Sequence, residues 1–495
     1  MNGDTNARLE GDLPVASAAE AAEVVADGDT VAVSGFGSVG YPKAVPEALV
    51  DRDGLTILSA GSVGDEIDET LVESGTIDRR AHFQARPAIR EAINAGEVAF
   101  FDRHVSQFGD ELRAGGGLDV DVAIVEAVAV GVSDSEGEGV DDGWLVPSTS
   151  IGHVPSIVRA ADRLILEVNH AQPRELEAVH DVLERSPPPD REPLTIEHPI
   201  ERVGDPRVTF DPEVLAAVVE TDVPDDPYTF RDPTAADREI AANLGSFLEG
   251  EVATNPTFAS SLAIQFGVGS LGNALMGALA DVELGDREVV YFGEVFQDGL
   301  LDMLDAGRLA GASATSLAMS RDGQNRFFED IDRYADDVVL RPADVSNSPA
   351  LIERFGVVGV NSAVEVDLYG NANATHVGGT RMVNGIGGGG DFARHARPSI
   401  VALPSTVRGG EISRIVPMTP HVDHIDHDVS VVVTEHGVAD LRGCSPRERA
   451  ERLTAIADPT FQEGLEDYRR RAETSGGQTP LDLETAFEWH REWSR

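Results

Sequence analysis

The sequence predicts an α/β protein of two tandem, similar domains, each built on a parallel sheet. The chain has 495 residues, more than one hydrophobic core usually supports, so two or more domains are expected. Strand-like apolar runs alternate with helix-like stretches, which is typical of parallel sheets with helices outside. The hexamer GFGSVG at 35–40 recurs as GVGSLG at 267–272, an offset of 232 residues (267 − 35). Such self-similarity indicates a duplicated domain.

A second match supports the duplication. The same offset aligns LVESGTI at 71–77 with MLDAGRL at 303–309, and a helix-like stretch, near Ala16 and near Ala235, precedes each hexamer. Between the copies the chain is rich in proline and acidic residues, as in VPDDP from Val223. We therefore expect an N-terminal domain over residues 1–225 and a C-terminal domain over residues 226–495.

The composition excludes several classes of partner. There are 87 acidic and 39 basic residues, which gives a formal net charge of -48. A charge of this size repels nucleic acid and anionic membranes. The acidic residues are spread along the whole chain, a pattern that indicates a halophilic surface, since concentrated salt screens the repulsion. Lys43 is the only lysine, and the other 38 basic residues (39 − 1) are arginines.

The sequence predicts a cytoplasmic protein without membrane partners. The N-terminal residues MNGDTNARLE have neither the basic nor the apolar region of a secretion signal. No apolar run approaches the roughly 20 residues that a membrane span needs. The single cysteine, Cys444, excludes an internal disulfide and a cysteine-based metal cluster.

Both glycine hexamers have the G-x-G-x-x-G spacing of a dinucleotide-binding loop. The first follows a strand-like run, TVAVS at 30–34, but Pro42 and Pro46 would disrupt the helix whose N-terminus should hold a pyrophosphate. The second is followed by Glu294, 22 residues after Gly272 (294 − 272), near the spacing of a ribose-binding acid. A nicotinamide-dependent dehydrogenase therefore remains open on this evidence.

The two copies differ at the end of their second strand. In the second copy the strand VVYFGE ends on Glu294, whereas in the first, LTILSAGS, no acid follows until Asp65. Ligands of open α/β sheets bind beyond the carboxyl ends of the strands, so we expect Glu294 to face a cleft. Glu294 then has three interpretations: a ribose anchor, a carboxylate that caps a turn, or a catalytic nucleophile or base.

Several long sequence blocks resemble the acetyl-CoA hydrolase and CoA-transferase family, which includes succinyl-CoA:acetate and 4-hydroxybutyrate CoA-transferases. The blocks run from about Gly35 to Arg442, nearly the whole chain. They are GYPKAVP from Gly40, GVG from Gly267, GEVFQDGLLDMLDAG from Gly293, SNSP around Asn347, GNANATHV from Gly370, NGIGGGGDFAR from Asn384, LPSTVRGG near Arg408 and HVDHIDHDV from His421.

The resemblance implies covalent catalysis by Glu294. The carboxylate would attack an acyl-CoA thioester and end as a glutamyl-CoA thioester, which a second carboxylic acid resolves. This predicts a CoA-transferase acting on small acids such as acetate, propionate, succinate or hydroxybutyrate. An acetyl-CoA hydrolase with the same nucleophile is the alternative, and a non-catalytic CoA sensor is a third possibility. Coenzyme A enters as a substrate, no permanently bound cofactor or metal is expected, and a homodimer is expected.

The resemblance also assigns the remaining site residues. The backbone N–H groups of Val268 and Gly388 would form one oxyanion hole, and the side chain of Asn347 would serve a second. The acyl-CoA would lie against Gly267, Val268, Gly269, Ser270, Leu271, Gly387, Gly388 and Arg408. Lys43 is a further candidate, since its compact ammonium group could bind a CoA phosphate, but a single remaining lysine can also be incidental.

The chain departs from the family pattern in two places. Arg408 stands where the family usually has lysine, which alters the geometry of a phosphate contact. Relatives that use acetate often read IPDR near the domain junction, whereas here Asp226 occupies the place of that arginine. Arg231, five residues on, is a candidate substitute. His421, His424 and His427 match no zinc signature, so metal binding there is a minority interpretation.

Overall fold

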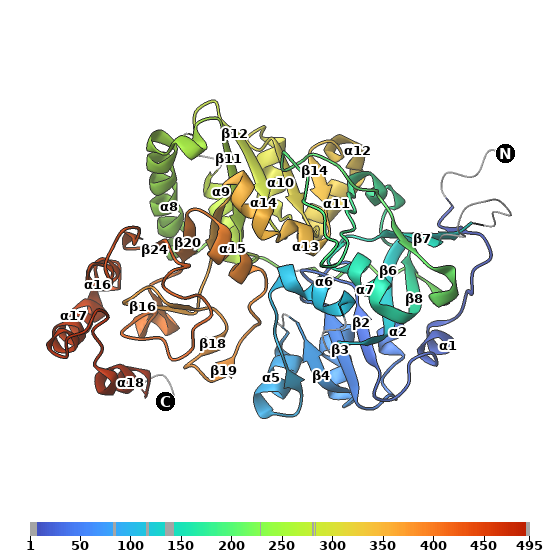
Figure 1. Cartoon of the computed structure of the whole chain (residues 1–495), viewed down its shortest axis with the longest axis horizontal. Helices are drawn as coiled ribbons and strands as arrows, with labels where there is room; N and C mark the ends of the chain where they lie inside the picture. Colours follow the sequence, from blue (N-terminus) through green and yellow to red (C-terminus); the bar gives the residue numbers. More distant parts are fainter. Residues whose placement is uncertain are drawn as a thin grey trace. The chain divides into compact units, whose positions relative to one another are not determined.

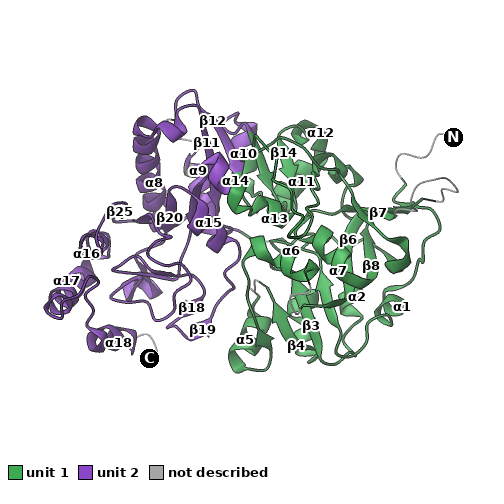
Figure 2. Cartoon of the chain, in the orientation of Figure 1, with its two compact units in different colours: residues 1–229, 292–301, 311–351 green, residues 230–291, 302–310, 352–495 purple. Residues whose placement is uncertain are grey.

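The computed structural model describes residues 7–82, 86–114, 118–133, 143–227, 229–279, 282 and 284–491. The chain forms two compact units, coloured separately in Figure 2. Unit 1 comprises residues 1–229, 292–301 and 311–351, and unit 2 comprises residues 230–291, 302–310 and 352–495. Unit 1 therefore adds two later segments to the N-terminal part of the chain, and the first of these contains Glu294. The sequence had assigned Glu294 to the C-terminal domain.

The main sheet of unit 1 has the strand order β10-β8-β6-β2-β3-β4-β5. Every neighbouring pair on this path is parallel, as predicted. The strands are β2 (Thr30–Val33), β3 (Leu55–Ser59), β4 (Ile77–Ala81), β5 (Ala99–Phe100), β6 (Val120–Val132), β8 (Ala161–Asn169) and β10 (Leu215–Thr221). Three further strands, β1 (Leu9–Glu10), β7 (Gly143–Pro147) and β9 (Val208–Phe210), extend it through β6 and β7.

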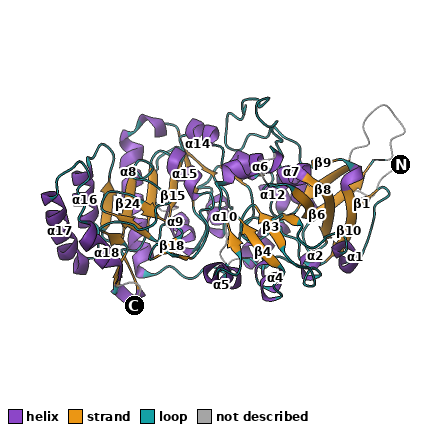
Figure 3. Ribbon diagram, turned by 60° about the horizontal axis from the view of Figure 1, so that its bottom comes forward, coloured by secondary structure: helices purple, strands orange, loops and turns teal. Residues whose placement is uncertain are grey.

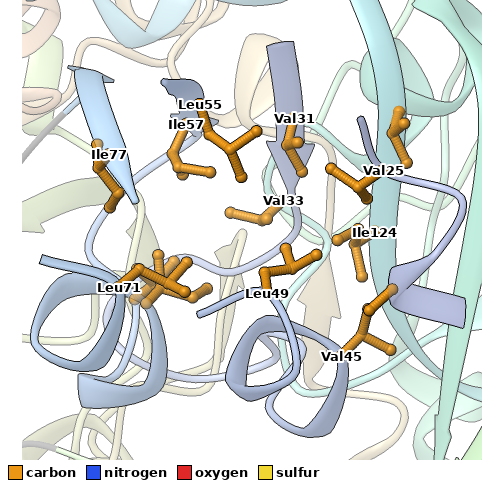
Figure 4. Packing of buried hydrophobic residues seen from close by; sticks show 14 of the residues in the cluster. Val25, Val31, Val33, Val45, Leu49, Leu55, Ile57, Leu71, Ile77 and Ile124 are labelled. Carbon is orange, nitrogen blue, oxygen red and sulfur yellow. The ribbon is translucent and has the colours of Figure 1, made fainter. Parts of the chain in front are cut away.

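Helices flank this sheet, in the alternation that the sequence predicts (Figures 1 and 3). They are α1 (Ala18–Ala22), α2 (Ala44–Glu47), α3 (Asp65–Asp68), α4 (Thr70–Glu73), α5 (Pro87–Ala95), α6 (Val105–Arg113) and α7 (Val154–Ala160). Figure 4 shows the core that results. Valine and isoleucine side chains of β2, β3 and β6 pack against Val45 of α2, Leu49 just after α2 and Leu71 of α4, and these residues are fully or almost fully buried. Burial on this scale is the main favourable contribution to folding.

The later segments of unit 1 carry β13 (Gly311–Ala314), which pairs in parallel with β14 (Val338–Leu340), and the helices α11 (Arg321–Glu329), α12 (Ile331–Tyr334) and α13 (Ala343–Ser346). Two helices, α10 (Asp298–Asp305) and α14 (Pro349–Phe355), contain the residues at which the chain passes from unit 1 to unit 2.

Unit 2 has a similar sheet, with the order β12-β11-β15-β20-β24-β25. The strands are β11 (Ser261–Phe266), β12 (Glu288–Phe292, whose last residue already belongs to unit 1), β15 (Val358–Asn361), β20 (Ser399–Ala402), β24 (Val431–Thr434) and β25 (Gly437–Asp440). The first five are parallel, and β25 returns antiparallel to β24. Across the sheet, the spatial order β24-β20-β15-β11-β12 repeats the order β10-β8-β6-β2-β3 of unit 1. This repetition confirms the prediction of two similar parallel-sheet domains.

Unit 2 also contains a small sheet and a C-terminal group of helices. The small sheet is built on β16 (Glu365–Asp367), β17 (Ala372–Asn373) and β23 (Ile415–Val416). The hairpin strands are β18 (His376–Val377) with β19 (Arg381–Met382), and β21 (Thr406–Val407) with β22 (Ile412–Ser413). The helices are α8 (Ala235–Thr254), α9 (Ser270–Leu279), α15 (Gly389–His395), α16 (Pro446–Ala455), α17 (Pro459–Thr474) and α18 (Leu483–Arg491).

Capping residues explain where two of the predicted helices begin. The Ser17 side chain accepts a hydrogen bond from the backbone N–H of Glu20 at the start of α1, and Thr234 does the same with Asp237 at the start of α8. Each acidic side chain reaches back to the cap residue, so both helices have a complete capping box. No helix among the described residues is long and apolar enough to cross a membrane.

Candidate active site

Glu294 lies two residues beyond the carboxyl end of β12, as the strand pattern predicts. Within unit 1 its carbonyl oxygen accepts hydrogen bonds from the backbone N–H groups of Thr315, at 2.7 Å, and Ser316, at 3.2 Å. The residue is 8% exposed. The backbone of Glu294 is thus fixed by the chain that follows β13, while its side chain keeps a small accessible surface.

The side chain of Asn347 contacts the Glu294 carboxylate. Asn347 Nδ2 donates to Glu294 Oε1 at 3.0 Å, and Asn347 is completely buried at the C-terminal end of α13. The other end of the amide is also held, because Asn347 Oδ1 accepts from Ser346 Oγ at 3.0 Å. An uncharged donor orients the carboxylate and leaves its negative charge in place. This pair can therefore present an oriented anionic nucleophile.

The first glycine hexamer lies next to Glu294 in unit 1. The loop turns through positive φ at Gly35, Gly37, Ser38 and Gly40. A Cβ on Gly37 would lie 2.8 Å from Ala318 Cβ and 3.4 Å from a methyl carbon of Val295, so only glycine fits there. The loop therefore packs directly on the residue that follows Glu294.

This first loop lacks the helix that a dinucleotide site requires. α2 is only four residues long, begins at Ala44, and contains Pro46. No long helix N-terminus follows the glycines, which agrees with the disruption expected from the prolines.

The second glycine hexamer connects β11 to α9 in unit 2. Gly269 has a φ of 130°, and a Cβ on Gly272 would lie 2.1 Å from the carbonyl oxygen of Gly267. The first turn of α9 therefore packs closely on the loop. The Val268 side chain is 40% exposed, and Ser270 and Leu271 are the first residues of α9.

Asn361, at the end of β15, lies between the second hexamer and Gly388. A Cβ on Gly267 would lie 3.0 Å from Asn361 Oδ1, and one on Gly389, the first residue of α15, would lie 4.0 Å from it. Gly388 is buried at the N-terminal cap of α15. Unit 2 thus brings the predicted Val268 and Gly388 segments to the same end of its sheet.

Sequence reasoning missed Asn361 and its partner. Asn361 and Gln265 exchange two hydrogen bonds between their side-chain amides, at 3.1 and 3.2 Å. They belong to the adjacent parallel strands β15 and β11. The available signal was a polar amide residue near the carboxyl end of each apolar strand, where ligand-binding loops begin.

Arg408 and Gly387 occupy turns in unit 2. Arg408 has a φ of 52° and an exposed side chain. Gly387 has a φ of 56°, directly before Gly388. An exposed arginine is free of the desolvation cost that a buried cation carries, which suits a contact with a phosphate.

Lys43 is placed differently from the phosphate contact expected from the sequence. Its side chain is 1% exposed, and its ammonium group pairs with Glu126 at 2.5 Å and with Asp225 at 2.9 Å. These carboxylates raise the pKa of Lys43 against the opposing effect of burial. The group is therefore a cation satisfied inside unit 1, which speaks against its binding a CoA phosphate.

The junction residues belong to different units. Asp226 of unit 1 is exposed. In unit 2, Arg231 pairs with Asp237 at 2.5 Å, and its backbone N–H donates to Ser270 Oγ at 3.1 Å. Arg231 thus adjoins the second glycine loop, with its guanidinium already engaged by a carboxylate.

The histidine segment forms local contacts between histidine and aspartate side chains. His421 pairs with Asp423 at 3.1 Å, and His427 with Asp426 at 3.4 Å. His424 is buried, and its backbone N–H donates to Ala372. Among the residues described, no group of three or more histidine, cysteine or acidic side chains is arranged to hold a metal ion.

Comparison with known proteins identifies relatives along the whole chain. The model of the acetyl-CoA hydrolase/transferase N-terminal domain matches residues 9–220, and that of the C-terminal domain matches residues 323–469. The succinyl-CoA:acetate CoA-transferase of Clostridium kluyveri is 39% identical over 96% of this chain and 88% of its own length. An acetyl-CoA hydrolase of Neurospora crassa is 37% identical over 94% of this chain and 91% of its own length.

Solved structures show the same fold. The 4-hydroxybutyrate CoA-transferase of Porphyromonas gingivalis superposes with a TM-score of 0.62 over 92% of this chain and 97% of its own, at 22% identity. Sequence motifs, family models and fold thus agree, and the chain belongs to the acetyl-CoA hydrolase/transferase family.

Proposed function

We propose that this protein is a CoA-transferase that moves coenzyme A between small carboxylic acids, with Glu294 as the covalent nucleophile. The observation that carries the proposal is the Glu294–Asn347 pair, a nearly buried carboxylate oriented by an uncharged amide at 3.0 Å. Family membership supplies the substrate class, because relatives of both halves of the chain are CoA-transferases and acetyl-CoA hydrolases.

The first half-reaction forms an enzyme thioester. The Glu294 carboxylate attacks the thioester carbonyl of an acyl-CoA, and collapse of the tetrahedral oxyanion releases the CoA thiolate and leaves a mixed anhydride. The thiolate then attacks the glutamyl carbonyl of the anhydride, which releases the acyl group as a free carboxylate and leaves glutamyl-CoA. Dividing the transfer in this way replaces one difficult step by easier ones.

The second half-reaction repeats these steps in reverse order. An acceptor carboxylate attacks glutamyl-CoA to give a new mixed anhydride and CoA thiolate. The thiolate attacks the acceptor's carbonyl, which yields a new acyl-CoA and restores the Glu294 carboxylate. Water as the acceptor would give hydrolysis, so both activities can share one nucleophile.

Each tetrahedral intermediate needs hydrogen-bond donors for its oxyanion. We propose that these donors are the backbone N–H groups of Val268 and Gly388 and the side-chain amide of Asn347. A preorganised donor of this kind contributes about 3–4 kcal/mol to lowering a barrier. The loop at 267–271, together with Gly387, Gly388 and the exposed Arg408, is proposed to bind the acyl-CoA.

The relatives favour small acids as the substrates. The Clostridium kluyveri relative is a succinyl-CoA:acetate CoA-transferase, although Asp226 here stands where relatives that use acetate often have an arginine. We therefore propose acids of the acetate, propionate, succinate and hydroxybutyrate class. A nicotinamide dehydrogenase has no comparable support, because the relatives named above are a CoA-transferase and an acetyl-CoA hydrolase.

An acceptor panel tests the proposal. Purified protein is incubated with acetyl-CoA or succinyl-CoA, alone and with each of several carboxylates, and both free thiol and new acyl-CoA are measured. A transferase gives ping-pong kinetics, new acyl-CoA, and little thiol without an acceptor. Steady thiol release in buffer alone would assign the hydrolase activity instead, and the absence of both would contradict the proposal.

A further inference from the structure

Unit 1 contains a buried charge cluster that the proposed reaction does not use. The cluster consists of Lys43, before α2, Glu126 in β6 and Asp225 after β10. Lys43 Nζ lies 2.5 Å from Glu126 Oε2 and 2.9 Å from Asp225 Oδ1, and both carboxylate side chains have 0% exposure. Lys43 Nζ also donates to the carbonyl oxygen of Tyr41 at 2.7 Å. These three side chains are called the Lys43 cluster below.

The choice of residue in the cluster is informative. Burying ions costs several kcal/mol for each, and apolar residues of similar volume often stabilise a fold as well or better. Lys43 is also the only lysine in a chain whose other basic residues are arginines. A compact ammonium directs three donors to separate acceptors, whereas the planar guanidinium of arginine does not reproduce this geometry. Stability alone therefore gives little reason for this cluster.

The Lys43 cluster holds two loops of unit 1. Asp225 Oδ1 accepts from the backbone N–H of Gly40 at 3.1 Å, which fixes the end of the first glycine hexamer. Asp225 Oδ2 accepts from Thr149 Oγ1 at 2.7 Å, and Glu126 Oε1 accepts from Ser148 Oγ at 2.6 Å. The same ions thus bind the glycine loop and the segment at 148–149.

Backbone hydrogen bonds connect the segment at 149–151 to the peptide of Glu294. The backbone N–H of Leu317 donates to the carbonyl of Thr149 at 2.9 Å, and that of Ile151 donates to the carbonyl of Thr315 at 2.9 Å. Thr315 in turn donates its backbone N–H to the carbonyl of Glu294 at 2.7 Å. The path from Asp225 to Glu294 therefore has three steps: a hydrogen bond to Thr149, the backbone from Thr149 to Ile151, and hydrogen bonds from Ile151 through Thr315 to Glu294.

The glycine loop gives a second path to the same place. Phe36 belongs to the buried apolar cluster that also contains Val295 and Ala318. Gly37 packs on the same two residues. Both loops held by the Lys43 cluster therefore contact the segment at 315–318, whose backbone binds that of Glu294, and the glycine loop also contacts Val295.

We propose that Lys43, Glu126 and Asp225 are positioning residues for Glu294. The role rests on the proposed function, since it needs a nucleophile to position. By holding the glycine loop and the 148–151 segment, the cluster fixes the Glu294 peptide against Asn347. A displacement of about 1 Å of a reacting group costs roughly 100-fold in rate, so loosening either loop lowers kcat more than it raises KM.

The variant Thr149→Val tests the link with little disturbance of the charges. It removes the hydroxyl that joins Asp225 to the 149–151 segment and leaves the three ions paired. Thr76→Val is the matched control, because Thr76 is also fully buried in unit 1 and its hydroxyl bonds only Ser74 and the Val50 carbonyl among the described contacts. Lys43→Arg and Asp225→Asn extend the test to the ions, with circular dichroism to show that each variant is folded at the assay temperature.

We expect the two threonine variants to have similar stability but different turnover. Both threonine variants lower the melting temperature slightly, but only Thr149→Val lowers kcat, by about 10-fold or more, with KM for acyl-CoA within about two-fold of wild type. Equal kcat in Thr149→Val, Thr76→Val and wild type would overturn the positioning role while leaving the proposed function intact. A folded wild-type protein that turns over no acyl-CoA would overturn the proposed function and the positioning role together.

Discussion

At the scale of single residues, the chemistry depends on how Glu294 is held. Asn347 orients the carboxylate with a neutral donor, and its own carbonyl end is anchored by Ser346. A charged donor in the same place would lower the nucleophilicity of the carboxylate by pairing with it. The amide is thus suited both to orient the nucleophile and to meet an oxyanion later in the reaction.

Replacement of this amide should affect turnover far more than stability. We expect Asn347→Ala to lower kcat by about 10²–10³-fold, the usual cost of removing one oxyanion donor. Steady-state kinetics with acyl-CoA and a thermal melt of the same preparation check this. A folded variant with kcat within three-fold or so of wild type would show that Asn347 has no part in the transition state.

Glu365 of β16 gives a pH dependence of stability away from the site. Burial raises the pKa of Glu365 to about 7, and Asp367 adds to the shift while a hydrogen bond from Asn373 opposes it. The folded state therefore holds this proton more tightly than the unfolded state. Its contribution to stability is full below the ordinary pKa near 4.5, and it is lost as the pH rises through about 7.

The variant Glu365→Gln should remove this dependence. Relative to wild type, its free energy of unfolding should rise by about 1–3 kcal/mol between pH 5 and pH 8, since one pKa unit corresponds to about 1.4 kcal/mol. Urea titrations of both proteins at the two pH values give the comparison. The same difference at both pH values would mean that the Glu365 carboxyl titrates normally in the fold.

At the scale of elements, two similar hexamers form different loops. The first is followed by the four-residue α2, because two prolines interrupt the chain, whereas the second runs into the ten-residue α9. Only the second therefore presents loop amides at the start of a helix. The sequence alone predicts that Pro42 and Pro46 disrupt the helix after the first hexamer. It also predicts the strand ends at which Glu294 and Gly267 lie.

Asn361 connects the elements on which the second hexamer and α15 rest. We expect Asn361→Ala to raise KM for acyl-CoA by about 10-fold. The substitution removes two amide hydrogen bonds, each of which contributes about 1 kcal/mol. It therefore leaves the Gln265 side chain unpaired and loosens the loops that rest on Asn361. Asn371→Ala is the control, since the Asn371 side chain bonds Asp367 and the backbone N–H of Asp426 in the same unit rather than these loops. If both variants raise KM equally, or neither does, Asn361 does not support the CoA loops.

At the scale of the whole molecule, the duplicated sheet could be predicted and the division into units could not. The repeat offset and the alternation of strands and helices indicate both sheets. The return of residues 292–301 and 311–351 to unit 1 depends on contacts far apart in the chain, such as those of Val295 with Phe36. The buried ion pairs of Lys43 could not be predicted for the same reason. Its partners Glu126 and Asp225 are 83 and 182 residues away in the chain (126 − 43 and 225 − 43), and no local sequence pattern joins them.

The net charge of -48 predicts that salt stabilises the protein. Raising KCl from about 0.1 M to about 1 M shortens the Debye length from roughly 10 Å to roughly 3 Å, so repulsion among carboxylates weakens. We expect the melting temperature to rise steeply over this range and acyl-CoA turnover to persist at the higher concentration. A melting temperature that falls or stays level in KCl would contradict the halophilic interpretation.

In the proposed mechanism, Glu294 carries coenzyme A as a thioester during turnover. Protein treated with acyl-CoA and then with borohydride, followed by peptide mass analysis, tests this directly. Two variants are treated in parallel: Glu294→Gln, and Glu288→Gln at the exposed first residue of β12. We predict that wild type and Glu288→Gln yield an alcohol in place of the Glu294 carboxyl group, and that Glu294→Gln yields none and is inactive. An active protein in which Glu294 stays unmodified would contradict the mechanism.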